Sequence, residues 1–287
     1  MDGLSDDGQF GLTIIAFVGS VFSPYYHWSG RSEPDNHCAI NVCLYGPGAR
    51  RWTMTERGKT AVTRDASHFA VGPSSLTWDG TALTIDLNEV GMPIPQRARG
   101  RITVHPGAMT ENGFALDAKG AHRWWPIAPS SRIEVDFQDP ALRWSGHGYL
   151  DSNCGDEPIE DAFATWDWSR TDVKDGCAVL YDTRNRDGSR SSVAVHFSSD
   201  GTATDFEAPP RQPLKSTFWQ VKRGTQADGD VRIRQTLEDT PFYARSVLET
   251  TVGGRKGLAV HESIDLDRLK SPIVKLMLPW RMPRRFI

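Results

Sequence analysis

Short runs in which apolar and polar residues alternate recur along the whole chain. Leu83, Ile85 and Leu87 alternate with polar residues, and the stretch 132–137 repeats the pattern. Because successive side chains of a strand point to opposite faces, each run predicts a half-buried strand. Further strands are predicted at 39–45, 102–105, 231–237, 244–251 and 258–266. Strands at this spacing, separated by Gly, Pro, Asp or Asn turns, predict an all-β sandwich or barrel.

The composition excludes several classes of protein. Hydrophobic residues make up 38% of the chain and charged residues 24%, which excludes a disordered, collagen-like or coiled-coil chain. The net charge of -3 gives no overall attraction to nucleic acid, so we expect no nucleic-acid partner. The sequence lacks the run of about 18 apolar residues that a spanning helix requires, so we expect no membrane crossing.

The length predicts more than one domain. At about 150 residues per domain, 287 residues correspond to roughly two domains. The acidic, glycine-containing loop 153–158 is the predicted boundary, which gives an N-terminal domain at 1–157 and a C-terminal domain at 158–287. We expect the first domain to carry the site.

Helical spacing is found near the end of the sequence. The apolar residues of this segment can share one helix face before Pro279, and they are Leu266, Leu269, Ile273, Val274 and Leu276. We therefore predict one short helix there.

Two predicted strands place titratable and aromatic groups on a single face. In the run LRWSGHGYLD, alternation puts His147, Tyr149 and Asp151 on one face. In a second run, 120–125, His122 and Trp124 share a face. Arg123 and Trp125 point to the other face. If both strands line one barrel, these groups converge on a site. The alternative is a solvated face beside ordinary core aromatics.

Trp166 and Trp168 also share a strand face, and they either pack in a core or line a tunnel for an apolar ligand. His27 and His37 have no partners at metal-ligand spacing, so we expect no metal site. The glycine-rich nucleotide motifs, the zinc-protease motif and the serine-hydrolase elbow are all missing from the sequence.

Six longer motifs resemble those of one known family. They are SVFSPYYHW, NHCAINVCLYG, RWTMTERG, FAVGPSSLTWDG, HRWWPIAP and GHGYLDSNCGDEP. In this order they resemble the bacterial carotenoid 1,2-hydratases, also called hydroxyneurosporene synthases. The resemblance is dense from Ser20 to Trp168 and looser in the second half of the chain.

The resemblance implies a fold and an activity. Relatives in this family have two lipocalin-like antiparallel β-barrel domains, so we expect an all-β fold of that kind with a short C-terminal helix. The family adds water to the C-1,2 double bond of acyclic carotenoids such as neurosporene or lycopene, without a cofactor or metal. The reaction is that of a hydro-lyase, and in purple bacteria it leads toward spheroidene or spirilloxanthin.

The resemblance also implies site residues. The family pattern contains a His-x-Trp pair and a Tyr-x-Asp pair, which correspond here to His122 with Trp124 and Tyr149 with Asp151. We expect these four residues to be catalytic. The expected substrate-binding residues are Trp166, Trp168, Tyr25 and Trp28.

Hydrating an unactivated alkene requires a strong local acid and a stabilised cation. We expect Asp151 to be the acid, because an apolar tunnel would raise the pKa of its carboxyl group by desolvation. His122 is the expected base, although the two roles are exchangeable. Trp124 can stabilise the tertiary cation by cation–π attraction. Tyr149 can do the same or hold the Asp151 carboxyl group.

The substrate implies contact with lipid. We expect peripheral association with the cytoplasmic side of the inner or intracytoplasmic membrane. The segment from Lys270 to Ile287 combines basic and apolar residues without an acid, so it is either a lipid-binding surface or a helix followed by a solvated tail. Two other functions remain open: a proton-initiated terpenoid cyclase of the same fold, and a carotenoid carrier without catalytic activity.

Overall fold

The computed structural model describes residues 1–285, and most of them lie in β-strands. Contacts group the chain into two compact units, each built from separate stretches of sequence. Unit 1 contains residues 1–107, 131–150 and 275–285, and unit 2 contains 108–130 and 151–274. The division into domains after residue 157 stays a prediction.

Unit 1 is built on a large sheet that is antiparallel except for the pairing of its last strand, β23, with β5. Its N-terminal strands are β1 (Asp2–Ser5), β2 (Gly11–Val18), β3 (Cys38–Tyr45), β4 (Arg51–Met54), β5 (Glu56–Arg57), β6 (Val62–Arg64), β7 (His68–Val71), β8 (Ser74–Trp78), β9 (Leu83–Gly91) and β10 (Gln96–Ala108). Its short helices are α1 (Pro24–Trp28), η1 (Pro34–Asn36) and η2 (Lys59–Ala61). The strand order is β23-β5-β3-β2-β1-β13-β12-β10-β9-β8-β7-β6, with β4 paired to β3.

The core of unit 1 follows from the alternation seen in the sequence. Ile85 and Ile102 are directly opposed in the β9–β10 register, and both side chains are buried. Directly opposed residues project from the same face, so the apolar positions of neighbouring strands form one layer. Ile133, Val135 and Phe137 contribute to the same cluster, which the sequence predicted.

Two long strands, β12 (His122–Asp139) and β13 (Ala141–Gly155), each contribute residues to both units. The short strand β11 (Phe114–Ala115) pairs with the beginning of β12. The residues proposed for catalysis therefore come from the ends of β12 and β13.

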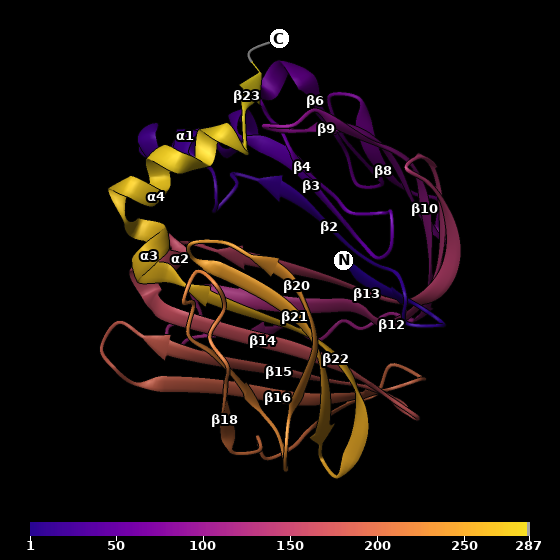
Figure 1. Ribbon diagram of the computed structural model, residues 1–287, viewed down its shortest axis with the longest axis vertical. Helices are drawn as coiled ribbons and strands as arrows, with labels where there is room; N and C mark the ends of the chain where they lie inside the picture. Colours follow the sequence, from indigo (N-terminus) through magenta and orange to yellow (C-terminus); the bar gives the residue numbers. More distant parts are fainter. Residues whose placement is uncertain (286–287) are drawn as a thin grey trace. The chain divides into compact units, whose positions relative to one another are not determined.

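Unit 2 contains a seven-stranded antiparallel sheet in the order β17-β16-β15-β14-β22-β21-β20. Its strands are β14 (Phe163–Val173), β15 (Gly176–Asn185), β16 (Arg190–Ser198), β17 (Ala203–Asp205), β20 (Arg232–Asp239), β21 (Tyr243–Val252) and β22 (Arg255–Asp265). A separate ribbon pairs β18 (Arg211–Leu214) with β19 (Arg223–Gln226), and the short helix α2 (Ile159–Ala162) precedes β14. Figure 1 shows β14, β15 and β16 side by side.

The all-β prediction is confirmed, as are the predicted strands and the short helical structure near the C-terminus. Over the described residues the strand order in each sheet is open, with end strands on both sides. No helix in residues 1–285 is both long enough and apolar enough to cross a membrane.

The C-terminal helical segment, yellow in Figure 1, consists of α3 (Leu266–Lys270), α4 (Pro272–Met277) and η3 (Leu278–Trp280). The single helix predicted there is interrupted at Ser271, which is extended. Pro272 explains the interruption, because proline lacks an N–H group and disfavours a helical residue before it. As a result, Leu266, Leu269 and Val274 are buried, whereas Ile273 and Leu276 are exposed.

The chain then returns to the sheet of unit 1. The strand β23 (Arg284–Arg285) pairs in parallel with β5. The Arg284 guanidinium group donates to the buried carboxylate of Glu56, which also lies 2.8 Å from Nδ1 of His37. Arg281 lies over the ring of Trp52 at 4.1 Å from its centroid.

Candidate functional site

The side chains of the first four residues of β12 alternate between two faces as the sequence predicts. His122 and Trp124 are buried, whereas Arg123 and Trp125 between and after them are exposed. The exposed Arg123 forms a bidentate ion pair with Asp156, at 2.7 and 2.8 Å. The alternation therefore places one histidine and one indole on the interior side of this strand.

Trp124 contacts the proposed acid directly. Its indole Nε1–H donates a hydrogen bond of 3.2 Å to Oδ2 of Asp151, which lies on β13. The Asp151 residue is half-buried, whereas the Trp124 side chain has no exposed surface. The structure thus brings together the tryptophan of the His-x-Trp pair and the aspartate of the Tyr-x-Asp pair.

An aromatic cluster surrounds Trp124. Its ring centroid lies 5.0 Å from that of Phe114, 5.1 Å from that of Tyr181 and 6.0 Å from that of Phe197. These distances lie within the range of favourable aromatic pairs. The indole is therefore fixed on several sides, which fixes the direction of its N–H group.

Tyr181 connects this cluster to β13 and to β14. Its hydroxyl group donates a hydrogen bond of 3.3 Å to Oδ1 of Asn153, which follows Asp151 by two residues and so projects from the same face of the strand. Its ring lies 5.2 Å from that of Trp166. Trp166 is therefore part of the cluster that contains Trp124.

His122 has a protein partner at each ring nitrogen. Its Nδ1 lies 3.1 Å from Oδ2 of Asp117, and its Nε2 lies 3.2 Å from the carbonyl oxygen of Glu157. Its backbone N–H donates to the same oxygen of Asp117 at 2.7 Å. The ring also contacts that of Phe163 at 4.9 Å. The imidazole is thus held between the turn at Asp117 and the segment that follows β13.

The Asp117 carboxylate is stabilised in its charged form. Burial opposes its ionisation, but hydrogen bonds from the backbone of His122 and Ala121 and from the His122 ring outweigh this effect. The pKa of Asp117 consequently lies below its ordinary value. A charged acceptor beside His122 makes this contact stronger than a neutral hydrogen bond.

Tyr149 lies two residues before Asp151 on β13, in the part of the strand that belongs to unit 1. Its side chain is completely buried, and in the β1–β13 register it is opposed to Asp2. By strand alternation Tyr149 and Asp151 project from the same face. The predicted Tyr-x-Asp arrangement is therefore compatible with the local backbone.

The predicted substrate-binding residues lie in different places. Trp166 and Trp168 are buried on β14, and Trp168 is opposed to Tyr181 in the β14–β15 register. Tyr25 and Trp28 belong to α1 in unit 1, with ring centroids 5.8 Å apart, and 51% of Trp28 is exposed. A role for all four in substrate binding stays a prediction.

Sequence reasoning missed several residues of the cluster. Asp117 and Glu157 lie in turns, and the turn of Asp117 is marked only by the Asp-x-Lys-Gly pattern, in which its Oδ1 accepts from the backbone of Lys119. Asn153 could have been found, because it continues the alternation that begins with Tyr149. No local pattern links Tyr181 to Trp124, since tertiary packing alone brings them together.

The opposite face of the sheet in unit 2 is polar. Asp167, between the two tryptophans of β14, accepts hydrogen bonds from Ser263 and from Arg211, the latter at 2.8 Å. Burial raises the pKa of Asp167 to about 6. His261, whose Nε2 lies 2.8 Å from the carbonyl oxygen of Gly224, is completely buried, and desolvation lowers its pKa to about 4.

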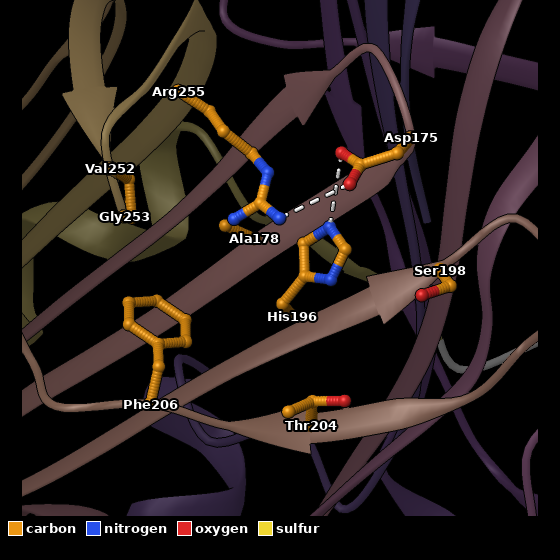
Figure 2. A pocket seen from close by; sticks show the side chains of 9 residues that line it. All are labelled: Asp175, Ala178, His196, Ser198, Thr204, Phe206, Val252, Gly253 and Arg255. Atoms are coloured by element: carbon orange, nitrogen blue, oxygen red, sulfur yellow. Dashed lines mark hydrogen bonds and ion pairs between the residues drawn. The ribbon is translucent and has the colours of Figure 1, made fainter.

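A pocket of about 420 Å³ also lies in unit 2. Figure 2 shows the carboxylate of Asp175 between His196 and Arg255, at 3.4 and 3.2 Å, with Phe206 lining another part of the pocket. His196 directly precedes Phe197 on β16, so the two residues project from opposite faces. The pocket and the Trp124 cluster therefore use opposite faces of β16.

Comparison with known proteins gives a consistent result. The carotenoid hydratase family (CrtC) matches residues 14–287. Acyclic carotenoid 1,2-hydratase of Thiocapsa roseopersicina is 57% identical over 290 residues, covering 99% of this chain and 72% of the relative. The enzyme of the same name from Rubrivivax gelatinosus is 53% identical over 294 residues, with the same shares covered.

A solved structure supports the fold. The crystal structure of a protein from Nitrosomonas europaea assigned as AttH has a TM-score of 0.59 and 14% sequence identity, and the match covers 92% of this chain and 91% of that one. Because the family matches nearly the whole chain and the relatives share more than half of its residues, the chain belongs to the carotenoid hydratase family.

Proposed function

We propose that this protein is an acyclic carotenoid 1,2-hydratase that adds water to the C-1,2 double bond of substrates such as neurosporene or lycopene. The product is a tertiary 1-hydroxy-1,2-dihydro carotenoid. Membership of the carotenoid hydratase family supports this activity, and so do relatives named for it. The observation that carries the residue assignment is the hydrogen bond between Trp124 and Asp151 in an aromatic cluster.

Asp151 is the proposed acid. Protonation of C-2 produces a tertiary cation at C-1, and the proton donor must be a carboxylic acid in its neutral form. The Trp124 N–H group donates to Oδ2, so this oxygen acts as an acceptor, and we assign the acidic proton to Oδ1. In this proposal the indole favours Oδ1 as the oxygen that delivers the proton.

The proposed steps balance without an external reagent. The O–H bond at Oδ1 of Asp151 breaks as the π electrons of the double bond form the C–H bond at C-2. A water oxygen then binds C-1, and one of its protons returns to the Asp151 carboxylate. The carboxylic acid is regenerated, and no net oxidation or reduction occurs, so the proposed reaction is that of a hydro-lyase without a cofactor.

We assign positioning roles to His122 and Trp124. Both ring nitrogens of His122 face protein acceptors, which supports a role in fixing the end of β12. The rings packed around Trp124 support a role in orienting Asp151. Tyr149, on the same strand face as Asp151, is the proposed aromatic partner of the cation, a contact worth roughly 0.5–2 kcal/mol.

The substrate also suggests where the enzyme acts. Acyclic carotenoids dissolve in lipid, so we propose that the protein contacts the cytoplasmic face of the inner or intracytoplasmic membrane. Spheroidene or spirilloxanthin synthesis in photosynthetic bacteria is the proposed context.

The test is anaerobic incubation with lycopene or neurosporene in lipid vesicles and water labelled with heavy oxygen, followed by mass analysis. We expect the label in a hydroxylated product. Unlabelled isomers of unchanged mass would instead indicate a cyclase, and binding without conversion would indicate a carrier.

The residue assignment is tested with two matched variants. Asp151→Asn should abolish hydration while carotenoid binding and the fold persist, because an amide cannot donate a carboxylic proton. Asp156→Asn removes an exposed carboxylate from the same region and should retain activity. Near-native turnover by Asp151→Asn would reject Asp151 as the acid.

A further inference from the structure

Four large apolar side chains are exposed along the C-terminal helical segment. They are Ile273, Leu276, Met277 and Trp280, with exposed fractions of 71%, 67%, 43% and 75%. We call these four residues the apolar stripe. Single exposed apolar residues are common on proteins, but four neighbouring ones indicate an interaction surface.

The spacing of the apolar stripe explains why its members adjoin one another. Positions i, i+3, i+4 and i+7 lie on one side of a helix, and α4 continues directly into η3. Among the residues between them, Val274, Lys275 and Leu278 are buried. This short segment is therefore amphipathic, with its larger apolar side chains on the solvent side.

The segment is anchored at both ends. Before it, Leu266 and Leu269 of α3 have no exposed surface, and the Asp265 side chain caps this helix through the backbone N–H of Arg268 at 3.0 Å. After it, Arg281 lies over Trp52 and β23 pairs with β5. These contacts hold the residues on either side of the apolar stripe within their own units.

The charges around the apolar stripe fit an anionic surface. From Arg268 to the end of the sequence there are six basic residues and no acidic ones. Lys275 is buried, and Arg268, Lys270 and Arg284 form ion pairs with Asp265, Asp161 and Glu56, whereas Arg285 is exposed. Exposed apolar residues with a tryptophan, flanked by cations, are typical of segments that bind at a membrane interface.

We propose that the apolar stripe inserts into the interfacial layer of a bilayer that contains anionic lipid. Its four side chains enter the boundary between head groups and acyl chains, and the neighbouring cations contact the lipid phosphates. The proposal deepens the membrane contact already included in the proposed function and rests on it, because it names the segment that makes the contact. Phe286 and Ile287, which the sequence also suggested for this surface, lie outside the described residues.

The test is co-sedimentation of the full chain with vesicles of phosphatidylcholine, with and without phosphatidylglycerol. We expect binding to the mixed vesicles, weakened by salt because the ionic contribution is screened. The double variant Ile273→Ser with Leu276→Ser should partition into the mixed vesicles at least about tenfold less, since two apolar side chains that the bilayer would bury are lost. Trp280→Ser should weaken binding in the same direction.

Two controls show whether vesicle binding depends on the apolar stripe itself. Phe218→Ser removes an aromatic residue that is 86% exposed elsewhere in the chain, and it should bind vesicles like the unaltered protein. Asp151→Asn should also bind normally, so a failure of the proposed function would leave this result unchanged. With carotenoid presented in detergent micelles, the stripe variants should keep their hydratase activity.

Two results would overturn the proposal. The first is that the Ile273→Ser, Leu276→Ser double variant and the unaltered protein bind the mixed vesicles equally well, or that neither of them binds. The other is concentration-dependent self-association in sedimentation velocity that the same substitutions abolish, because the apolar stripe would then join two copies of the chain.

Discussion

The indole Nε1–H of Trp124 donates a hydrogen bond to Oδ2 of Asp151 over 3.2 Å, between residues 27 positions apart in the sequence. The bond joins the beginning of β12 to the end of β13, where the chain leaves one unit for the other. Because the Trp124 ring is fully buried, its N–H group has a fixed direction toward this carboxyl group. We therefore expect the proposed acid and its proposed orienting residue to act as a pair.

Trp124→Phe tests this pairing. Phenylalanine keeps an aromatic ring in the cluster but removes the N–H donor, so kcat should fall about 10- to 100-fold, as expected for one lost hydrogen bond to a carboxyl group. The neighbouring Trp125→Phe also removes an indole hydrogen bond, to the carbonyl oxygen of Thr110 at 2.8 Å, and should leave kcat nearly unchanged. Steady-state kinetics of both variants provides the measurement; equal losses would contradict a specific role for Trp124.

His122→Phe is expected to destabilise the fold. The substitution leaves the Asp117 carboxylate and the carbonyl oxygen of Glu157 without their ring partner, at a cost of about 2–4 kcal/mol in the free energy of unfolding. His147→Phe alters an exposed histidine and should change this free energy by less than about 0.5 kcal/mol. Urea unfolding of the two variants measures both values. An unchanged midpoint for His122→Phe would show that its two contacts do not support the fold.

Asp167 and His261 are expected to give opposite dependences of stability on pH. The pKa of Asp167 is raised from 3.8 to about 6, so its protonated form stabilises the folded state at low pH, and this contribution is lost as the pH rises from 3.8 through 6. The pKa of His261 is lowered from 6.5 to about 4, so its contribution is present above pH 6.5 and lost as the pH falls through 4. The contribution of each residue to the free energy of unfolding amounts to about 3 kcal/mol at most.

These opposing contributions should largely cancel in the unaltered protein and become visible in Asp167→Asn. In that variant the remaining contribution of His261 should make stability increase with pH between 4 and 6.5, more steeply than before. Denaturant unfolding at several pH values gives the slope of the free energy of unfolding against pH for the unaltered protein and for the variant. Parallel curves for the two proteins would mean that Asp167 has the same pKa in the folded and unfolded states.

Arg284→Ala should unfold more readily than its neighbour Arg285→Ala. Removing Arg284 leaves Glu56, whose side chain is 2% exposed, without its guanidinium partner, and breaking a buried ion pair costs about 3–5 kcal/mol. Arg285 is exposed, so its loss should change the free energy of unfolding by less than about 0.5 kcal/mol. Thermal unfolding of the two variants compares adjacent residues of one strand; similar melting temperatures would show that the Glu56 pair is not stabilising.

Period-2 alternation was sufficient to predict much of the fold. It located β9 and the central part of β12 because each has one face in the core, and it placed His122 and Trp124 on one face, which the structure shows to be buried. The same rule put Tyr149 and Asp151 on one face of β13. These predictions succeed because strand facing depends on local backbone geometry alone.

Other features depend on tertiary contacts that no local pattern encodes. The partners of His122 come from a turn at Asp117 and from the backbone of Glu157, and a backbone carbonyl has no signature in the sequence. Alternation did place His147 on the same face as Tyr149, yet His147 is exposed near Asp6 while Tyr149 is buried. What covers each position of a strand face decides its burial, and that depends on the neighbouring strands.

The parallel pairing of β23 with β5 also affects how the protein is made. A ribosome that has just added Glu56 must add another 228 residues before Arg284 exists. At 5–20 residues per second this takes about 10–50 s, during which the edge of β5 and the Glu56 carboxylate lack their final partners. The N-terminal strands therefore emerge first but complete their sheet late, so a nascent chain has a long interval in which chaperones can recognise that open edge.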